Sequence, residues 1–256
     1  MTGFSLHRVV ALVRQDFRLM RSDVMPYVTG LITPLVLMTL LKPVFDRLAD
    51  EPGNGAVQAV PGLAVTYMFF LVGHIGVTMF REHGWNTWLR LRTSPASGLE
   101  VVLGRAVSPM VAAIVHLTIL MSIGSLVFGL SVRGSLVALA LVGLSLSACL
   151  VAYGFALVAA LRTVMRLNAV ASLTAMLFGA IGGALIPISL VPSWLRPISP
   201  LTPTYWAMRG MRSVIVDGGG VVDVLAPVLV LLSMAAVCVA VTGYRFRMSE
   251  AKVTWA

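Results

Sequence analysis

The residues with the most chemical potential lie in one short segment, 80–95, between two long apolar runs. The segment reads FREHGWNTWLRLRTSP and combines two tryptophans with charged and hydroxyl side chains. At the spacing of an α-helix, Trp85, Trp88, Leu89 and Arg92 fall on one face, and Asn86, Thr87, Arg90 and Thr93 fall elsewhere. Two interpretations follow. The segment is an interfacial helix whose tryptophans lie among lipid headgroups, or its polar face docks a protein partner.

Several other kinds of chemistry are excluded by the residue types. A phosphate-binding loop needs a Gly-Lys-Ser/Thr element, and the only lysines, Lys42 and Lys252, precede a proline and a valine. The long apolar runs hold no acidic residue, which argues against a proton relay, a metal site or an acid–base enzyme within a membrane. Two histidines, His74 and His116, lie in these runs; each is a hydrogen-bonded packing residue or, alternatively, a ligand or proton carrier.

The composition indicates that the solvent of most of the chain is a bilayer. Of 256 residues, 58% are hydrophobic and 11% charged, and the mean hydropathy is +0.93. Both cysteines, Cys149 and Cys238, fall in apolar runs, where a small packing role is expected. Windows long enough to span a membrane predict six transmembrane helices, the fifth ending early because prolines crowd its far end: 24–41, 56–80, 106–132, 134–161, 167–195 and 224–244.

The distribution of basic residues predicts the orientation. With six spans both termini lie on one side, and the segments on that side carry 13 of the 19 Lys and Arg residues against 6 in the opposite loops. This bias predicts cytoplasmic termini. The net charge of +9 is then explained by topology and by attraction to anionic membrane lipid. A nucleic-acid partner is not expected, because the basic residues form no contiguous patch.

Residues 1–23 predict an amphipathic helix preceding the first span. Its arginines gather on one half of the helical wheel and its apolar residues on the other, with Asp16 the one polar residue on the apolar side. Such a helix lies in the headgroup plane or, alternatively, packs on a soluble partner. Pro26 marks the bend into the first span.

The segment 187–220, before the last span, is apolar but proline-rich. Its prolines rule out one long helix, so short helices at the outer interface are expected, anchored by Trp194, Tyr205 and Trp206. Just upstream, Gly179 and Gly183 form a small-xxx-small pair. This pair packs within the subunit, or it contacts a second subunit or acts as a hinge. The whole chain, 1–256, is predicted to be a single membrane domain.

Two motifs carry a resemblance to a known family. The first is Arg81-Glu82, then Gly84 to Pro95, followed by Gly104-Arg105; the second runs from Pro187 to Leu195, then Ser199 to Tyr205 and Arg209 to Arg212. In this order and spacing they resemble the type-2 ATP-binding-cassette (ABC) exporter permeases, most of all the daunorubicin-resistance type. With the spans and the N-terminal helix, the resemblance covers nearly the whole chain. Leu89 departs from it, since many members carry an acidic residue there.

The resemblance implies an all-α membrane protein that is not itself an enzyme. It implies a second permease subunit, identical or different, and two cytoplasmic ATPase subunits that bind ATP and magnesium, so that no cofactor binds this chain. Segment 81–98 is then a cytoplasmic coupling helix seated in the ATPase. Its expected coupling residues are Arg81, Glu82, Trp85, Thr87, Trp88, Arg90, Arg92 and Pro95.

The implied activity is export of a hydrophobic or amphiphilic drug, antibiotic or lipid across a bacterial plasma membrane. Export of a lipid-linked polysaccharide is the nearest alternative; aromatic rows favour carbohydrate routes, and the only obvious cluster within a span is Phe69, Phe70 and Phe80. A non-transporting membrane anchor for a cytoplasmic protein explains the docking segment but not the proline-rich one. A membrane-embedded enzyme needs intramembrane acids, which these windows lack.

Overall fold

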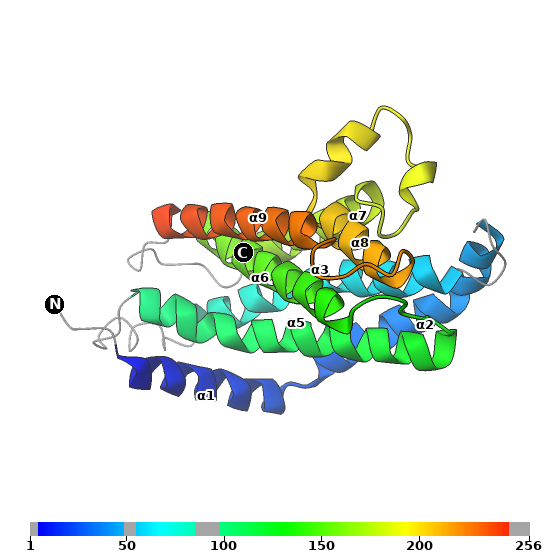
Figure 1. Ribbon diagram of the computed structural model, residues 1–256. Coiled ribbons are helices and arrows are strands. Elements are labelled where there is room, and N and C mark those ends of the chain that lie inside the picture. Colours follow the sequence, from blue (N-terminus) through cyan, green and yellow to red (C-terminus); the bar gives the residue numbers. More distant parts are fainter. Residues whose placement is uncertain (1–4, 49–54, 85–97, 246–256) are drawn as a thin grey trace.

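The computed structural model describes residues 5–48, 55–84 and 98–245, and the regular elements within those ranges are helices (Figure 1). Six of them are long and apolar enough to cross a membrane, which confirms the predicted all-helical fold. They are α2 (Met25–Leu48), α3 (Gly55–Gly84), α5 (Gly98–Phe128), α6 (Leu136–Ala160), α7 (Val164–Ile181) and α9 (Leu225–Arg245).

Helix α3 is the centre of the bundle. It contacts α2, α5, α6, α7 and the shorter α8 (Pro203–Ile215), and 72% of its membrane-span window is buried against 17% of that of α2. The ring of Phe69 on α3 meets Phe178 on α7 edge to face, with centroids 5.9 Å apart. Because α3 contacts most of the other helices, a displacement of this helix is felt across the bundle.

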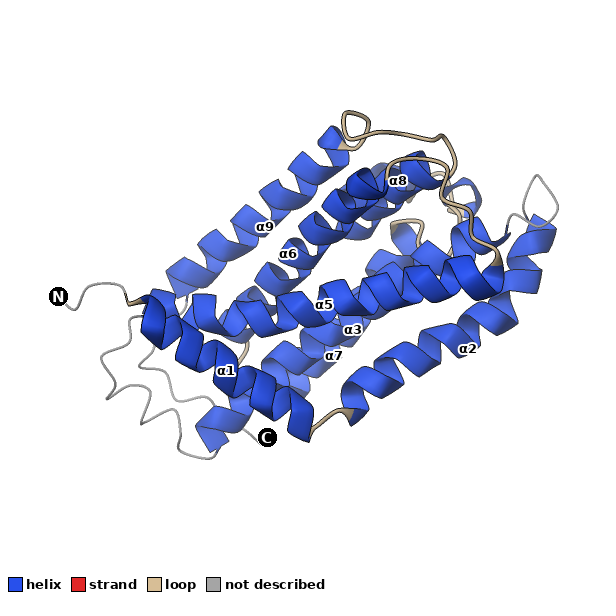
Figure 2. Ribbon diagram, turned by 60° about the horizontal axis from the view of Figure 1, so that its bottom comes forward, coloured by secondary structure: helices blue, strands red, loops and turns tan. Residues whose placement is uncertain are grey.

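The N-terminal helix α1 (Leu6–Ser22) lies beside the beginning of α5, and α2 follows it after a two-residue break (Figure 2). The start of α1, the start of α5 and the end of α9 lie at one end of the bundle (Figure 1). The end of α2 and the start of α3 lie at the opposite end. Antiparallel neighbours joined in this way are the pattern expected of a multi-span helical protein.

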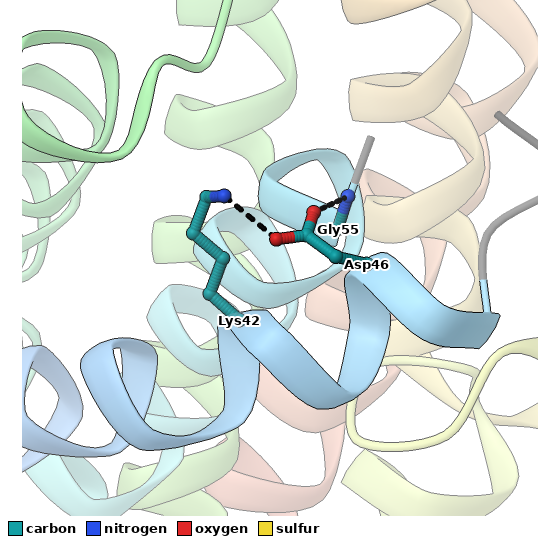
Figure 3. A network of polar contacts seen from close by, with 3 residues as sticks. All are labelled: Lys42, Asp46 and Gly55. Atoms are coloured by element: carbon teal, nitrogen blue, oxygen red, sulfur yellow. Dashed lines mark hydrogen bonds and ion pairs between the residues drawn. The ribbon is translucent and has the colours of Figure 1, made fainter. Parts of the chain in front are cut away.

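Predicted span boundaries at the ends of α2 and α3 and at the starts of α5 and α7 are wrong because charged residues continue these helices. The first helix runs to Leu48 rather than residue 41 and includes Lys42 and Asp46. Lys42 Nζ lies 2.8 Å from Asp46 Oδ2, and Asp46 Oδ1 accepts a hydrogen bond from the first amide of α3, Gly55 N, at 2.8 Å (Figure 3). An acidic side chain thus satisfies a helix N-terminus, joining α2 to α3.

The start of α5 is a further corrected boundary, because the helix begins at Gly98 rather than at residue 106. Glu100 and Arg105 therefore belong to the helix, and both are buried. The charge-free window begins after Arg105, whereas the helix begins before it and includes it. The reason is the packing of α1 against these turns, which is described below.

The fifth span ends early, as expected, but a glycine turn ends it. Gly183 has a φ of +84°, and the amides of Ala184 and Leu185 both donate to Gly179 O, at 2.9 and 2.8 Å. This left-handed turn closes α7 well before Pro187. The chain then forms the expected short helices: η1 (Ile188–Leu190), η2 (Arg196–Leu201) and α8.

Candidate functional site

The first turns of α5 form a close contact with the buried side of α1. Leu12 is buried against Gly104, where an added Cβ would lie 2.9 Å from the Leu12 Cβ. One turn further on, Ser108 Oγ donates to Met20 Sδ at 2.9 Å. A glycine at residue 104 lets the two helix backbones approach closely.

A buried ion pair lies at the centre of this contact. Arg105 Nη1 is 2.7 Å from Asp16 Oδ1, and their side chains are 3% and 11% exposed. Asp16, the one polar residue on the apolar side of α1, therefore faces an arginine 89 residues away in sequence. The structure places the buried side of α1 on α5, so a soluble partner is not needed to cover Asp16.

A second polar contact joins the beginnings of the two helices. Glu100 Oε1 accepts a hydrogen bond from Ser5 N, the N-cap residue of α1, at 2.6 Å, and Glu100 Oε2 lies 3.6 Å from Arg8 Nη1. Glu100 also lies in the first turn of its own helix. The carboxylate is therefore close to the N-termini of two helices, where their unpaired amides favour a negative charge. Its side chain is 1% exposed.

The exposed side of α1 carries Arg14, Arg18 and Arg21 together with Leu6, Val10 and Leu19. Positive charge beside exposed apolar side chains is the composition of a helix that lies on an anionic membrane surface. The interfacial placement of α1 stays a prediction, but its amphipathic division is consistent with the observed exposure.

The predicted coupling residues lie between the ends of α3 and α5. Arg81 and Glu82 belong to the last turn of α3, although their side chains fall outside the described atoms. The remaining ones, Trp85, Thr87, Trp88, Arg90, Arg92 and Pro95, fall outside the described residues. The helical flanks are nevertheless clear, because α3 continues to Gly84 and α5 starts at Gly98. The roles of these residues stay predictions.

Gly179 and Gly183 do not share one helix face. Gly179 is buried within α7, where an added Cβ would lie 3.0 Å from Thr66 Oγ1 of α3 and 3.2 Å from Leu185. Gly183 lies beyond the end of α7, in the left-handed turn. The small-xxx-small interpretation therefore fails as a helix-packing pair, because its second glycine is not helical. A role for either glycine between subunits is a separate prediction.

The aromatic residues predicted for the outer interface differ in exposure. Trp194 is 72% exposed, whereas Tyr205 and Trp206 are half-buried at the start of α8. Trp206 Nε1 donates to Pro200 O at 2.7 Å, its ring meets Tyr205 edge to face, and Arg209 lies 5.5 Å above it. These contacts fix Trp206 to the protein. Of these three aromatic side chains, Trp194 is the one most available to lipid.

Hydrogen bonds that the sequence alone did not reveal hold both the turn that ends α7 and the proline-rich segment to the bundle. Gln58 Nε2 of α3 donates to Gly183 O and Ala184 O, at 2.8 and 3.0 Å. Ser199 Oγ donates to Ile181 O at 2.7 Å, and the Thr204 hydroxyl donates to the carbonyl of Phe178. Carbonyls at the end of α7 thus find side-chain partners, as a buried helix end requires.

The remaining candidates supply no recognisable chemistry. His116 is buried, and its Nε2 has no hydrogen-bond partner among the described residues. His74 lies in α3, with its side chain outside the described atoms. Cys149 and Cys238 are free thiols on the adjacent helices α6 and α9. No group of three metal-ligating side chains occurs within 5–48, 55–84 and 98–245.

This architecture is that of a multi-pass helical membrane protein, with an amphipathic helix fixed to one end of the bundle. A family model for ABC-2 type transporters matches residues 7–216, and the chain belongs to that family. It is similar to the linearmycin resistance permease protein LnrN of Bacillus subtilis (strain 168), with 24% identity over 192 residues. That alignment covers 75% of this chain and 50% of LnrN, so the chain spans about half the length of this curated relative.

Family membership agrees with the resemblance that the two sequence motifs indicated. It makes the chain a membrane component of a transporter rather than an enzyme. The relation to LnrN, whose name describes a resistance permease, agrees with the daunorubicin-resistance type of motif.

Proposed function

We propose that the chain is the membrane subunit of an ABC exporter that moves a hydrophobic or amphiphilic compound out of a bacterial cell. ATP is hydrolysed on two separate cytoplasmic ATPase subunits, and a second permease subunit, identical or different, completes the pathway. The family match over residues 7–216 carries this proposal. The chain lies in the plasma membrane with both termini in the cytoplasm.

The arrangement of helices supports a coupling role for the segment between α3 and α5. Force applied there acts on the end of α3, which contacts α2, α5, α6, α7 and α8, and on the start of α5. Because packed helices transmit displacement rather than absorbing it, a push at this segment reaches most of the bundle.

Coupling also sets an energetic requirement. The segment must bind the ATP-bound and nucleotide-free arrangements of the ATPase pair with different affinity, since equal affinity shifts no equilibrium. Glu82 and Trp88 are suited to this difference: a charge at the end of α3 and a large aromatic side chain in the segment itself. Burial of such groups in a partner cleft changes binding energy steeply with position.

The resistance named for LnrN favours an antibiotic as the cargo. The apolar character of the six spans agrees with a route for a hydrophobic compound. An antibiotic is therefore the first substrate class to test.

The proposal is tested by reconstituting the chain with its ATPase in vesicles and measuring substrate-stimulated ATP hydrolysis and export. Glu82→Ala and Trp88→Ala are expected to lower both while the subunit still inserts in the membrane. Trp194→Ala is the matched control, because Trp194 lies in the proline-rich segment, far from α3's last turn in sequence, and is 72% exposed. It should preserve ATPase stimulation.

Wild-type stimulation and export in both coupling variants would contradict the coupling assignment. A partner that co-purifies without any substrate-stimulated ATP hydrolysis would instead favour a non-transporting membrane anchor.

A further inference from the structure

We infer that Arg105 is a positioning residue for transport: with Asp16 and Glu100 it clamps α1 to α5, so that the two helices move as one unit and pull the first span with them. The inference rests on the proposed export function. It begins from the placement of charge in a chain with only 10 acidic residues, two of which, Asp16 and Glu100, are buried in this one contact.

Buried ion pairs make a contact that resists sliding. Separating Arg105 from Asp16 would leave two charges with little access to water, which is strongly unfavourable. The 2.7 Å contact therefore has one favourable arrangement, whereas contacts between apolar side chains have many of similar energy. A helix that slid along α5 during transport would have to break this pair in every cycle.

The clamp also has two separated points, so it fixes rotation as well as translation. Asp16 meets Arg105 in the third turn of α1, and Ser5 and Arg8 meet Glu100 at its beginning. At a rise of about 1.5 Å per residue, the two points are roughly 16 Å apart along α1. Between them, Leu12 packs on Gly104 without space for a larger residue.

The clamp gives the first span a connection to the coupling segment. Helix α5 starts at Gly98, directly after that segment in the chain. Helix α1 ends at Ser22, and α2 begins at Met25 after only two residues. Motion of the start of α5 is therefore carried by α1 to the beginning of α2. Without the clamp, α2 would receive this motion through its side-by-side contacts with α3 and α5.

A disulfide across the contact tests whether the helices move together. In a background of Cys149→Ala and Cys238→Ala, the pair Leu12→Cys and Gly104→Cys places two Cβ atoms 2.9 Å apart before any adjustment. The two helices must therefore separate by about 0.6 Å to reach the roughly 3.5–4.5 Å of a disulfide. Substitution of Leu12 also removes its Cδ1 atom, which would otherwise lie 3.1 Å from the new Cβ. Each single cysteine variant, oxidised in the same way, is the control.

The oxidised pair is expected to export and to stimulate ATP hydrolysis within about twofold of its reduced form, since a bond between parts of one unit changes no equilibrium. Loss of export on oxidation that reductant restores would overturn the inference, as would failure of the pair to cross-link. Absence of export in the cysteine-free parent would instead overturn the proposed function itself. The two failures are thus distinct.

Charge substitutions separate positioning from folding. At equal amounts in the membrane, Arg105→Gln is expected to lower substrate-stimulated ATP hydrolysis at least about fivefold, the lower end of coupling between linked sites. Arg105→Lys should restore part of it, because it keeps the charge beside Asp16. Arg14→Gln, on the exposed side of α1, removes the same charge and should have no such effect. Wild-type stimulation in Arg105→Gln would overturn the role.

Discussion

The anchoring by Gln58 of the turn that ends α7 leads to a quantitative prediction. The Gln58 amide donates to two carbonyls, Gly183 O at 2.8 Å and Ala184 O at 3.0 Å, in the turn that ends α7. Gln58→Leu keeps the approximate side-chain volume and removes both donors. Hydrogen bonds between membrane helices contribute about 0.6 kcal/mol on average and up to about 1.7. A buried carbonyl left without a partner costs about 1–3 kcal/mol.

Gln58 is only half-buried, so water reaches part of this site after the substitution. The free-energy costs at the lower end of both ranges therefore apply. The expected loss is about 1–2 kcal/mol, which lowers the melting temperature of a chain of this size by roughly 2–8 °C. Tryptophan fluorescence of the purified subunit in detergent measures it. Gln15→Leu is the matched control, since Gln15 is exposed on α1. Equal melting temperatures for the two variants would refute the anchoring argument.

Two further substitutions test the packing of the bundle by the same measurement. His116→Leu removes a buried side chain whose Nε2 has no partner among the described residues, so the melting temperature should stay equal or rise; lost export at unchanged stability would show that His116 acts in transport. Gly134→Ala would place a Cβ 2.5 Å from Gly219 O and 2.7 Å from Val214 O, and should cost about 1–3 kcal/mol. Gly243→Ala, which meets nothing within 4 Å, is its control, and a Gly134 variant as stable as that control would contradict the close approach.

The number and order of the spans could be predicted from the sequence because the bilayer imposes a length on every apolar run. Each of the six windows contains most of one long helix. The short helices before the last span were also predictable, since closely spaced prolines interrupt a helix repeatedly, whereas α2, α3 and α5 each accommodate only one or two. These features depend on local residue types alone.

Features that depend on distant residues could not be predicted in this way. Asp16 was recognisable as the one polar residue on the apolar side of α1, but its partner Arg105 lies 89 residues away. The local residue pattern of either helix does not identify the other helix as its partner. The end of α7 shows the same limit on a smaller scale: Gly183 ends the helix because Gly179 O accepts two amides from the turn, a geometry that the downstream prolines do not require.

The corrected boundaries change how the coupling segment acts on the bundle. The charge-free windows leave residues 81–105 as the connection between the second and third spans. A flexible connection of that length would bend and would not pass a displacement on to the spans. In the structure α3 continues to Gly84 and α5 begins at Gly98. The eight extra residues at the start of α5 add about 12 Å of helix, which is stiff where a loop would bend.

Those turns can be helical and buried because α1 supplies Asp16 and the N-terminal amide of Ser5 to the charges that they carry. The charges that mark the end of an apolar window are therefore the same groups that make the third span rigid at its beginning. A charge next to an apolar run ends a span only when water must solvate it. A charge that is paired within the protein, as that of Arg105 is, lets the helix continue towards the segment that must transmit force.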